Sequence, residues 1–215
     1  MKTPGGLSAN EQNGINQVLG FYGGSCKYSS GTLPNGKTYF NIEMSNSPAL
    51  DSAVKIAELS IANIAILFYS DLKEERSKYS EIRTSIILDL GQKAEQKYPV
   101  AKLETVLSKM WVVKRIVELI RVGNFDALGE LLNDKSDLIT YNKNDLLTKI
   151  RNAEPSLGNI KEFIPYGFMF VKTDTKKEVL HIAGVLQRDK QNNEFSIDFD
   201  PESTKDEAIF LNYKL

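Results

Sequence analysis

Cysteine, histidine and tryptophan are the scarce residues of this 215-residue chain, with one of each, at Cys26, His181 and Trp111. A single cysteine excludes a disulfide within the chain, and structural zinc sites are built from several cysteines and histidines. A metal site would therefore consist almost entirely of carboxylates. The sequence predicts no disulfide framework, no metal and no cofactor.

Long apolar runs and an excess of one charge are also absent. No stretch approaches the roughly 18 apolar residues that a membrane-spanning helix needs, and 27 Lys and Arg balance 28 Asp and Glu at a pI of about 6.0. We therefore expect no transmembrane segment and no nucleic-acid partner. The opening MKTPGGLSANEQ lacks the apolar core of a signal peptide, which fits a cytoplasmic protein. As a polar lead-in, it fits equally an exported or lipid-anchored protein whose leader has been removed.

The first half of the chain predicts a hairpin followed by a long helix. Residues 21–29 and 37–44 favour strands because they are rich in aromatic and β-branched side chains, and the turn Leu33-Pro-Asn-Gly36 lies between them. A helix is expected to begin at Ser47, which can cap it ahead of a proline, and to run to about Leu72. Apolar residues at three- and four-residue steps support this helix.

Further along, residues 81–88 are expected to form a buried strand and residues 92–99 a polar connection. The apolar stripe over residues 103–120 predicts a long helix that ends at Gly123. Asn124 is expected to cap a short helix after it. A third helix is predicted over residues 145–153, and Pro155 is expected to end it. Alternating patterns then predict four antiparallel strands over residues 163–172, 178–188, 194–200 and 208–215.

Together these elements predict an α+β fold with two lobes. Residues 1–91 would form an N-terminal lobe with a β-hairpin, a long helix and a strand, and residues 92–215 a lobe with three helices packed on a curved four-stranded antiparallel sheet. This order, with the helix junction ELIRVGNFDAL at residues 118–128, resembles the nuclear transport factor two-like (cystatin-like) superfamily over about residues 100–215. The resemblance implies a cone-shaped pocket that family members use for catalysis, ligands or protein contacts.

The leading functional hypothesis is a non-enzymatic ligand-binding or protein-interaction module, because no set of acid, base and nucleophile is recognisable. Trp111, Tyr166 and Tyr213 are the candidate pocket residues, with a small apolar ligand or a protein as partner. The alternative is an enzyme that uses a pocket carboxylate and tyrosine on a small molecule. The ligand and the oligomeric state are left open.

A second alternative is nucleotide binding. Gly31 to Thr38 fits the phosphate-binding pattern GxxxxGK[ST], in which Gly36 and Lys37 would contact phosphates, and Asp89 after an apolar run could hold magnesium. A working phosphate loop opens a helix, however, whereas the residues after Lys37 favour a strand. We therefore interpret the motif as a hairpin turn and keep nucleotide binding as the alternative.

Two other features have simple structural interpretations. Asp198 to Glu202 resembles the start of a calcium loop, but Ser203 and Ile209 replace the glycine and the glutamate that such a loop needs. We interpret it as a solvated strand end and turn. Cys26 has no histidine close in sequence to activate it, so it is predicted to be a packed side chain, not a nucleophile.

His181 is predicted not to serve as a catalytic base. A loop over residues 189–192 would place His181 opposite Asp200, on the face of the sheet that does not carry Phe195 and Phe199. If the helices cover the apolar face, the imidazole points away from any pocket beneath them. We expect a cross-strand pair with the aspartate.

Overall fold

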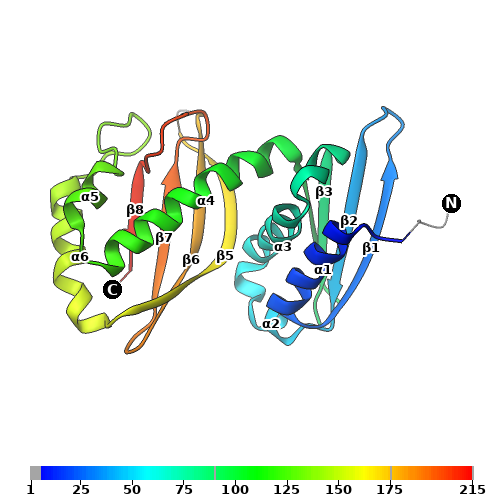
Figure 1. Ribbon diagram of the computed structural model, residues 1–215, viewed down its shortest axis with the longest axis horizontal. Helices are drawn as coiled ribbons and strands as arrows, with labels where there is room; N and C mark the ends of the chain where they lie inside the picture. Colours follow the sequence, from blue (N-terminus) through cyan, green and yellow to red (C-terminus); the bar gives the residue numbers. More distant parts are fainter. Residues whose placement is uncertain (1–5, 90, 175, 215) are drawn as a thin grey trace. The chain divides into compact units, whose positions relative to one another are not determined.

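The structure, a computed structural model, describes residues 6–89, 91–174 and 176–214. The chain divides into two compact units, Met1–Leu107 and Ser108–Leu215 (Figure 1). Each unit contains a four-stranded sheet with helices, which confirms the α+β class. The boundary falls inside the long helix α4 (Val100–Arg121), whereas the sequence pattern places it after residue 91. None of the helices described has the length and apolar character to cross a membrane.

Unit 1 is built on a mixed sheet of β1 (Ser25–Thr32), β2 (Thr38–Ser45), β3 (Glu81–Ile87) and β4 (Lys93–Pro99), in that order. The β2–β3 pair is parallel and the two outer pairs are antiparallel. The predicted hairpin and the predicted strand near residue 81 are both confirmed. The polar connection expected over residues 92–99 is wrong, because β4 occupies it.

Helix α1 (Ala9–Tyr22) was not expected from the sequence, and the strand predicted from Phe21 begins only at Ser25. The Ser8 side chain accepts a hydrogen bond from the amide of Glu11, whose carboxylate accepts one from the amide of Ser8. This reciprocal capping box satisfies amides that a helix start otherwise leaves unpaired. It fixes the first turn of a helix whose apolar residues Ile15, Val18 and Tyr22 are buried at three- and four-residue steps.

The helix predicted from Ser47 to Leu72 begins where expected but is interrupted. Its segments are α2 (Pro48–Ser52), a short 3-10 turn and α3 (Ala57–Asp71). The Ser47 hydroxyl accepts a hydrogen bond from the Leu50 amide and so caps α2, as predicted. Helix α3 is buried almost all round and lies beside α1 on one face of the sheet (Figure 1).

The core of unit 1 lies between this sheet face and the two helices. Phe40, Ile42 and Met44 alternate along β2 and are fully buried, and the Phe40 and Phe68 rings lie 4.4 Å apart between their centroids. Because side chains alternate along a strand, the residues between them point to the opposite face. Among the described residues of unit 1, no helix lies on that second face (Figure 1), and we call it the open face of unit 1.

Unit 2 has three helices on one face of its sheet: the second part of α4, then α5 (Phe125–Glu130) and α6 (Lys143–Leu157) (Figure 1). Asn124 caps α5 by accepting from the Ala127 amide, as predicted. The expectation that Pro155 ends the third helix is wrong, because α6 continues for two more residues and ends before Gly158. Gly158 has a φ of 81°, which glycine adopts without strain.

The sheet of unit 2 is the antiparallel series predicted from the sequence. Its strands are β5 (Ile160–Lys172), β6 (Glu178–Arg188), β7 (Asn193–Phe199) and β8 (Phe210–Tyr213), in that order. The β5–β6 register shifts twice, at Ile160/Glu162 and at Pro165/Gly167. The face beneath the helices is apolar; its buried side chains include Leu180, Ile182, Leu186, Phe195, Ile197 and Phe199.

Candidate functional site

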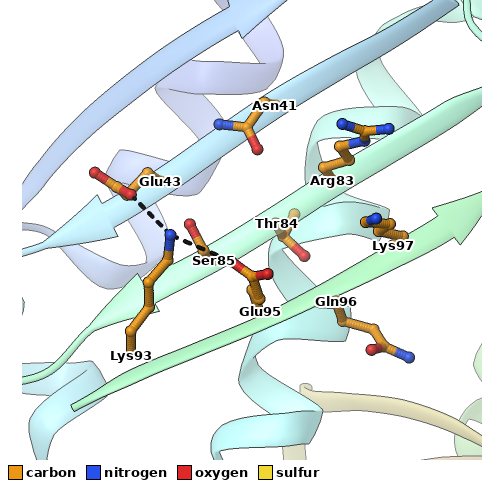
Figure 2. A pocket seen from close by; sticks show the side chains of 9 residues that line it. All are labelled: Asn41, Glu43, Arg83, Thr84, Ser85, Lys93, Glu95, Gln96 and Lys97. Carbon is orange, nitrogen blue, oxygen red and sulfur yellow. Dashed lines mark ion pairs between the residues drawn. The ribbon is translucent and has the colours of Figure 1, made fainter. Parts of the chain in front are cut away.

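Two rows of polar side chains cross the open face of unit 1. The strand register aligns Asn41 of β2 with Arg83 of β3 and Lys97 of β4 in the first row. Two residues along, it aligns Glu43 with Ser85 and Glu95 in the second row. Figure 2 shows both rows, with the helices behind the sheet.

These rows form a groove of about 580 Å³. Ser85 is only 4% exposed although no helix covers this face, because it lies between longer side chains of the neighbouring strands. Thr84 next to it points the other way and donates to the Ile61 carbonyl of α3. The lining residues are Asn41, Glu43, Arg83, Thr84, Ser85, Lys93, Glu95, Gln96 and Lys97.

The charges of the groove are separated along the strands. The Lys93 ammonium lies 3.6 Å from a Glu43 carboxylate oxygen and 3.2 Å from a Glu95 oxygen (Figure 2). The hydrogen bond to Glu95 is the main cause of the raised pKa of Lys93. Two carboxylates therefore share one ammonium at this end of the groove, which leaves it acidic.

The other end of the groove is basic. The Arg83 Nε lies 2.6 Å from a Glu81 oxygen, and its guanidinium carbon lies 4.1 Å from the centre of the Tyr39 ring. Lys97 is exposed and has no ion-pair partner in the described part of the chain. This end therefore carries two positive charges, of which only the Arg83 guanidinium is paired with a carboxylate in the described residues, and it attracts acidic groups.

The groove lacks the features of a catalytic or metal site. Neither histidine nor cysteine lines it. Within the described residues, no three His, Cys, Asp or Glu side chains are placed to hold a metal ion. Pockets for small ligands are usually enclosed and mostly apolar, whereas ionic side chains line this groove. Its chemistry favours exchange of ion pairs with another polar surface.

The residues of the phosphate-loop alternative do not form a cradle. Gly31 lies near the end of β1, and Lys37 lies just before β2. The Thr38 hydroxyl donates a hydrogen bond to the Lys78 carbonyl. Gly36 has a φ of 80° in the hairpin turn. Because β2 and β3 are parallel, Asp89 lies at the far end of the sheet from Lys37, on the order of 25 Å away at about 3.3 Å per residue.

The three residues predicted to line a pocket are not brought together. Trp111 is 49% exposed on α4. None of the three residues lines either of two cavities of about 410 Å³ that lie in the described part of unit 2. Tyr213 lies beneath the helices, with its ring 6.2 Å from Phe195. Tyr166 instead lies near Glu194 and Lys214, and its pKa is raised mainly by burial.

Tyr213 belongs to a buried ionic cluster that the sequence pattern did not reveal. The Arg188 side chain is fully buried and holds Glu154 of α6 through nitrogen–oxygen distances of 2.7 and 3.2 Å. Its Nε donates to the Asn193 side chain, 2.8 Å away. The Tyr213 hydroxyl donates to Glu154, and burial followed by this bond raises the pKa of Tyr213. These contacts hold α6 against the sheet.

His181 pairs with Asp198, so the expected partner Asp200 is wrong. The Nδ1 atom lies 2.6 Å from an Asp198 oxygen. The register differs from the prediction by two residues, so that Leu186 lies opposite Asn193. The loop is longer than predicted, and within it the Asn192 side chain accepts a hydrogen bond from the Arg188 amide. A shift by an even number of residues leaves each side chain on the same face of the sheet. His181 accordingly lies on the face away from the helices, as expected.

The remaining sequence features are structural. Burial raises the pKa of the Cys26 thiol to about 11, so it is protonated at neutral pH. The segment that resembles a calcium loop forms a turn, in which the Glu202 amide donates to an Asp200 oxygen, and the residues after it bind a lysine. The buried Lys109 ammonium donates to the carbonyls of Ser203 and Lys205 at 2.9 and 2.8 Å, and burial lowers its pKa.

No protein-family model, curated protein or solved structure matches this chain. The resemblance of residues 100–215 to the nuclear transport factor two-like superfamily therefore stays a prediction. The candidate site is defined by its geometry alone: it is a polar groove with one acidic and one basic end on the open face of unit 1.

Proposed function

We propose that this protein is a non-enzymatic protein-interaction module and that the open face of unit 1 receives its partner. The observation that supports this most strongly is the groove of about 580 Å³, which is lined by separated acidic and basic side chains and contains no catalytic set. Exposed ion pairs contribute little to stability, so they can be exchanged for pairs with a partner at small cost.

The spacing of the two rows indicates what the partner presents. Arg83 and Lys97 in one row attract a carboxylate, whereas Glu43 and Glu95 in the other attract a basic side chain. The rows are two residues apart along the strands, or about 7 Å. In an extended segment, side chains on one face have the same spacing. The proposed partner is a protein segment with an acidic and a basic side chain two residues apart.

Site-specific photo-crosslinking in cells tests this proposal. A photoreactive amino acid at Asn41, in the first row, should give a discrete crosslinked protein that Lys97→Glu removes. Lys55→Glu makes the same charge change on an exposed residue of the helix layer and should leave the crosslink intact. A crosslink that survives Lys97→Glu, or no crosslink at all, would contradict a charge-selected partner.

A second candidate function, an enzyme, is supported by one observation, the 2.6 Å contact between His181 and Asp198. A carboxylate can orient an imidazole as a general base. We would screen the full chain against hydrolase substrates and repeat any positive reaction with His181→Asn. Turnover that this substitution abolishes would favour the enzyme over the interaction module.

A further inference from the structure

The outer strands of the two sheets are β1 and β4 in unit 1 and β5 and β8 in unit 2. An outer strand presents backbone groups to solvent, and proteins protect such strands by charge, proline, bulges or shortness. β4 carries Lys93, Glu95 and Lys97 and ends at Pro99. β5 has two register shifts, one of them at Pro165, and β8 has four residues. Each of these three strands has a recognisable protection.

β1 is the least protected of the four outer strands. Its eight residues, SCKYSSGT, pair with β2 without a register shift, include no proline, and carry a single charge, at Lys27. The strand is exposed except at Cys26 and Gly31, which are half-buried. Among the outer strands described, β1 is the one best suited to pair with another strand.

The hairpin turn determines which backbone groups of β1 face outward. The Leu33 amide donates to the Lys37 carbonyl at 2.7 Å, and residues in an antiparallel pair alternate between facing the partner strand and facing away from it. Counting back from Leu33, the odd-numbered residues face β2. The amides and carbonyls that face outward belong to Cys26, Tyr28, Ser30 and Thr32.

We propose that β1 pairs antiparallel with β1 of a second copy of this chain, about a two-fold axis at Ser29. The four residues with outward backbone groups are placed symmetrically about this axis. Tyr28 then lies opposite Ser30 of the second copy, and Cys26 lies opposite Thr32. Two four-stranded sheets become one continuous sheet, through an edge that the open-face groove does not use.

The side chains of β1 favour a second copy as the occupant. In this register the one charged residue, Lys27, lies opposite Gly31 of the second copy, so like charges do not meet. The Tyr28 ring stacks on Phe40 with 6.2 Å between centroids yet stays 46% exposed. Pairing places strand atoms of the second copy beside this ring and removes apolar surface from water.

Sedimentation of the full chain tests the dimer. We expect a dimer that Ser30→Pro converts to a monomer, because proline removes an outward amide, while Ser30→Ala keeps that amide and leaves the dimer intact. Since Ser30 faces away from β2, proline there does not remove a bond of the β1–β2 pair, and circular dichroism verifies folding. A chain that is monomeric at every concentration, or a dimer that a folded Ser30→Pro preserves, would overturn the proposal.

Disulfide trapping tests the register independently of the proline variant. In a Cys26→Ser background, Ser29→Cys should form a covalent dimer on mild oxidation, because the two cysteines face each other at the axis. Lys27→Cys is equally exposed but would lie about 13 Å from its counterpart, beyond the roughly 7 Å that a disulfide spans. Equal trapping of both variants, or none of Ser29→Cys, would contradict the two-fold pairing.

Discussion

The two sheets of this protein differ in where they keep their charges. In unit 1, the ion pairs of Lys93 and Arg83 lie on the open face, within reach of solvent. In unit 2, Arg188 and Lys109 are at most 5% exposed and are held by Glu154 and by loop carbonyls. Buried pairs are costly to break, whereas surface pairs are not. Charge therefore holds α6 against the sheet in unit 2, whereas on the open face of unit 1 it is available for contacts.

The largest effect expected from this difference is on unit 2. Arg188→Met should lower the free energy of unfolding by about 3 kcal/mol or more, because it leaves the mostly buried Glu154 carboxylate without its cation. Arg83→Met on the open face of unit 1 should cost less, about 1 kcal/mol, because the Arg83 side chain keeps 22% of its surface exposed whereas that of Arg188 keeps none. Circular dichroism during urea unfolding measures this smaller loss. Urea unfolding followed by Trp111 fluorescence reports on unit 2 directly, since the tryptophan lies in its part of α4.

A double variant provides the control for that comparison. Arg188→Met combined with Glu154→Gln removes both charges and should recover part of the lost stability, because no unpaired charge is left in the interior. If Arg188→Met and Arg83→Met cost the same, the contrast between the two units would be wrong.

A smaller effect is expected from Glu11, an acidic side chain that is buried in unit 1. Burial raises the pKa of Glu11, but hydrogen bonds from Lys78, Tyr79 and Ser8 outweigh it, and the net pKa is lowered from 4.5. Glu11→Gln should lower the free energy of unfolding at neutral pH by about 1–3 kcal/mol. Circular dichroism during urea unfolding measures this loss.

The pH dependence separates charge from packing at Glu11. Because the folded pKa is lowered, the carboxylate contributes its stability above pH 4.5 and loses it as the pH falls through the folded pKa. The difference between the unsubstituted chain and Glu11→Gln should therefore shrink below pH 4.5. A difference that stays constant on acidification would show that the ionised carboxylate is not what stabilises α1.

The smallest effect is expected when nucleotide is added, because we predict that unit 1 does not bind it. Magnesium and ATP should leave the melting temperature unchanged, because Gly31 to Thr38 form a hairpin that leads into strand β2 and not into a helix. A real site would add about 2.7 kcal/mol at a hundredfold excess over the dissociation constant. A saturable rise that Lys37→Ala abolishes would restore the phosphate-loop alternative.

Local patterns predicted the elements with a strong period or a clear cap. Alternation predicted the four strands of unit 2. The faces predicted for β6 and β7 are correct despite the two-residue error at His181, because a shift by an even number of residues keeps each side chain on its side. Ser47 and Asn124 were identified as caps from residue type and position alone. These signals act over a few residues, so the sequence reports them directly.

Two elements of unit 1 were missed, although helix α1 carries apolar residues at three- and four-residue steps. Helix α1 depends on its packing beside α3, although the Ser8 and Glu11 spacing was a readable start signal. The sequence KAEQKYP of β4 has mostly exposed side chains, because the strand lies at the edge and gains its hydrogen bonds from β3. Both elements form through partners that lie elsewhere in the chain.

The sequence by itself determined the α+β class, the caps Ser47 and Asn124 and the apolar face of β6 and β7, because these depend on short periods and neighbouring residues. Only the tertiary structure decided which charges are buried. Arg188 meets Glu154 across 34 residues, and Glu11 meets Lys78 across 67. It also aligned Asn41, Arg83 and Lys97 on one face, since strand order and register bring together residues that no local pattern connects.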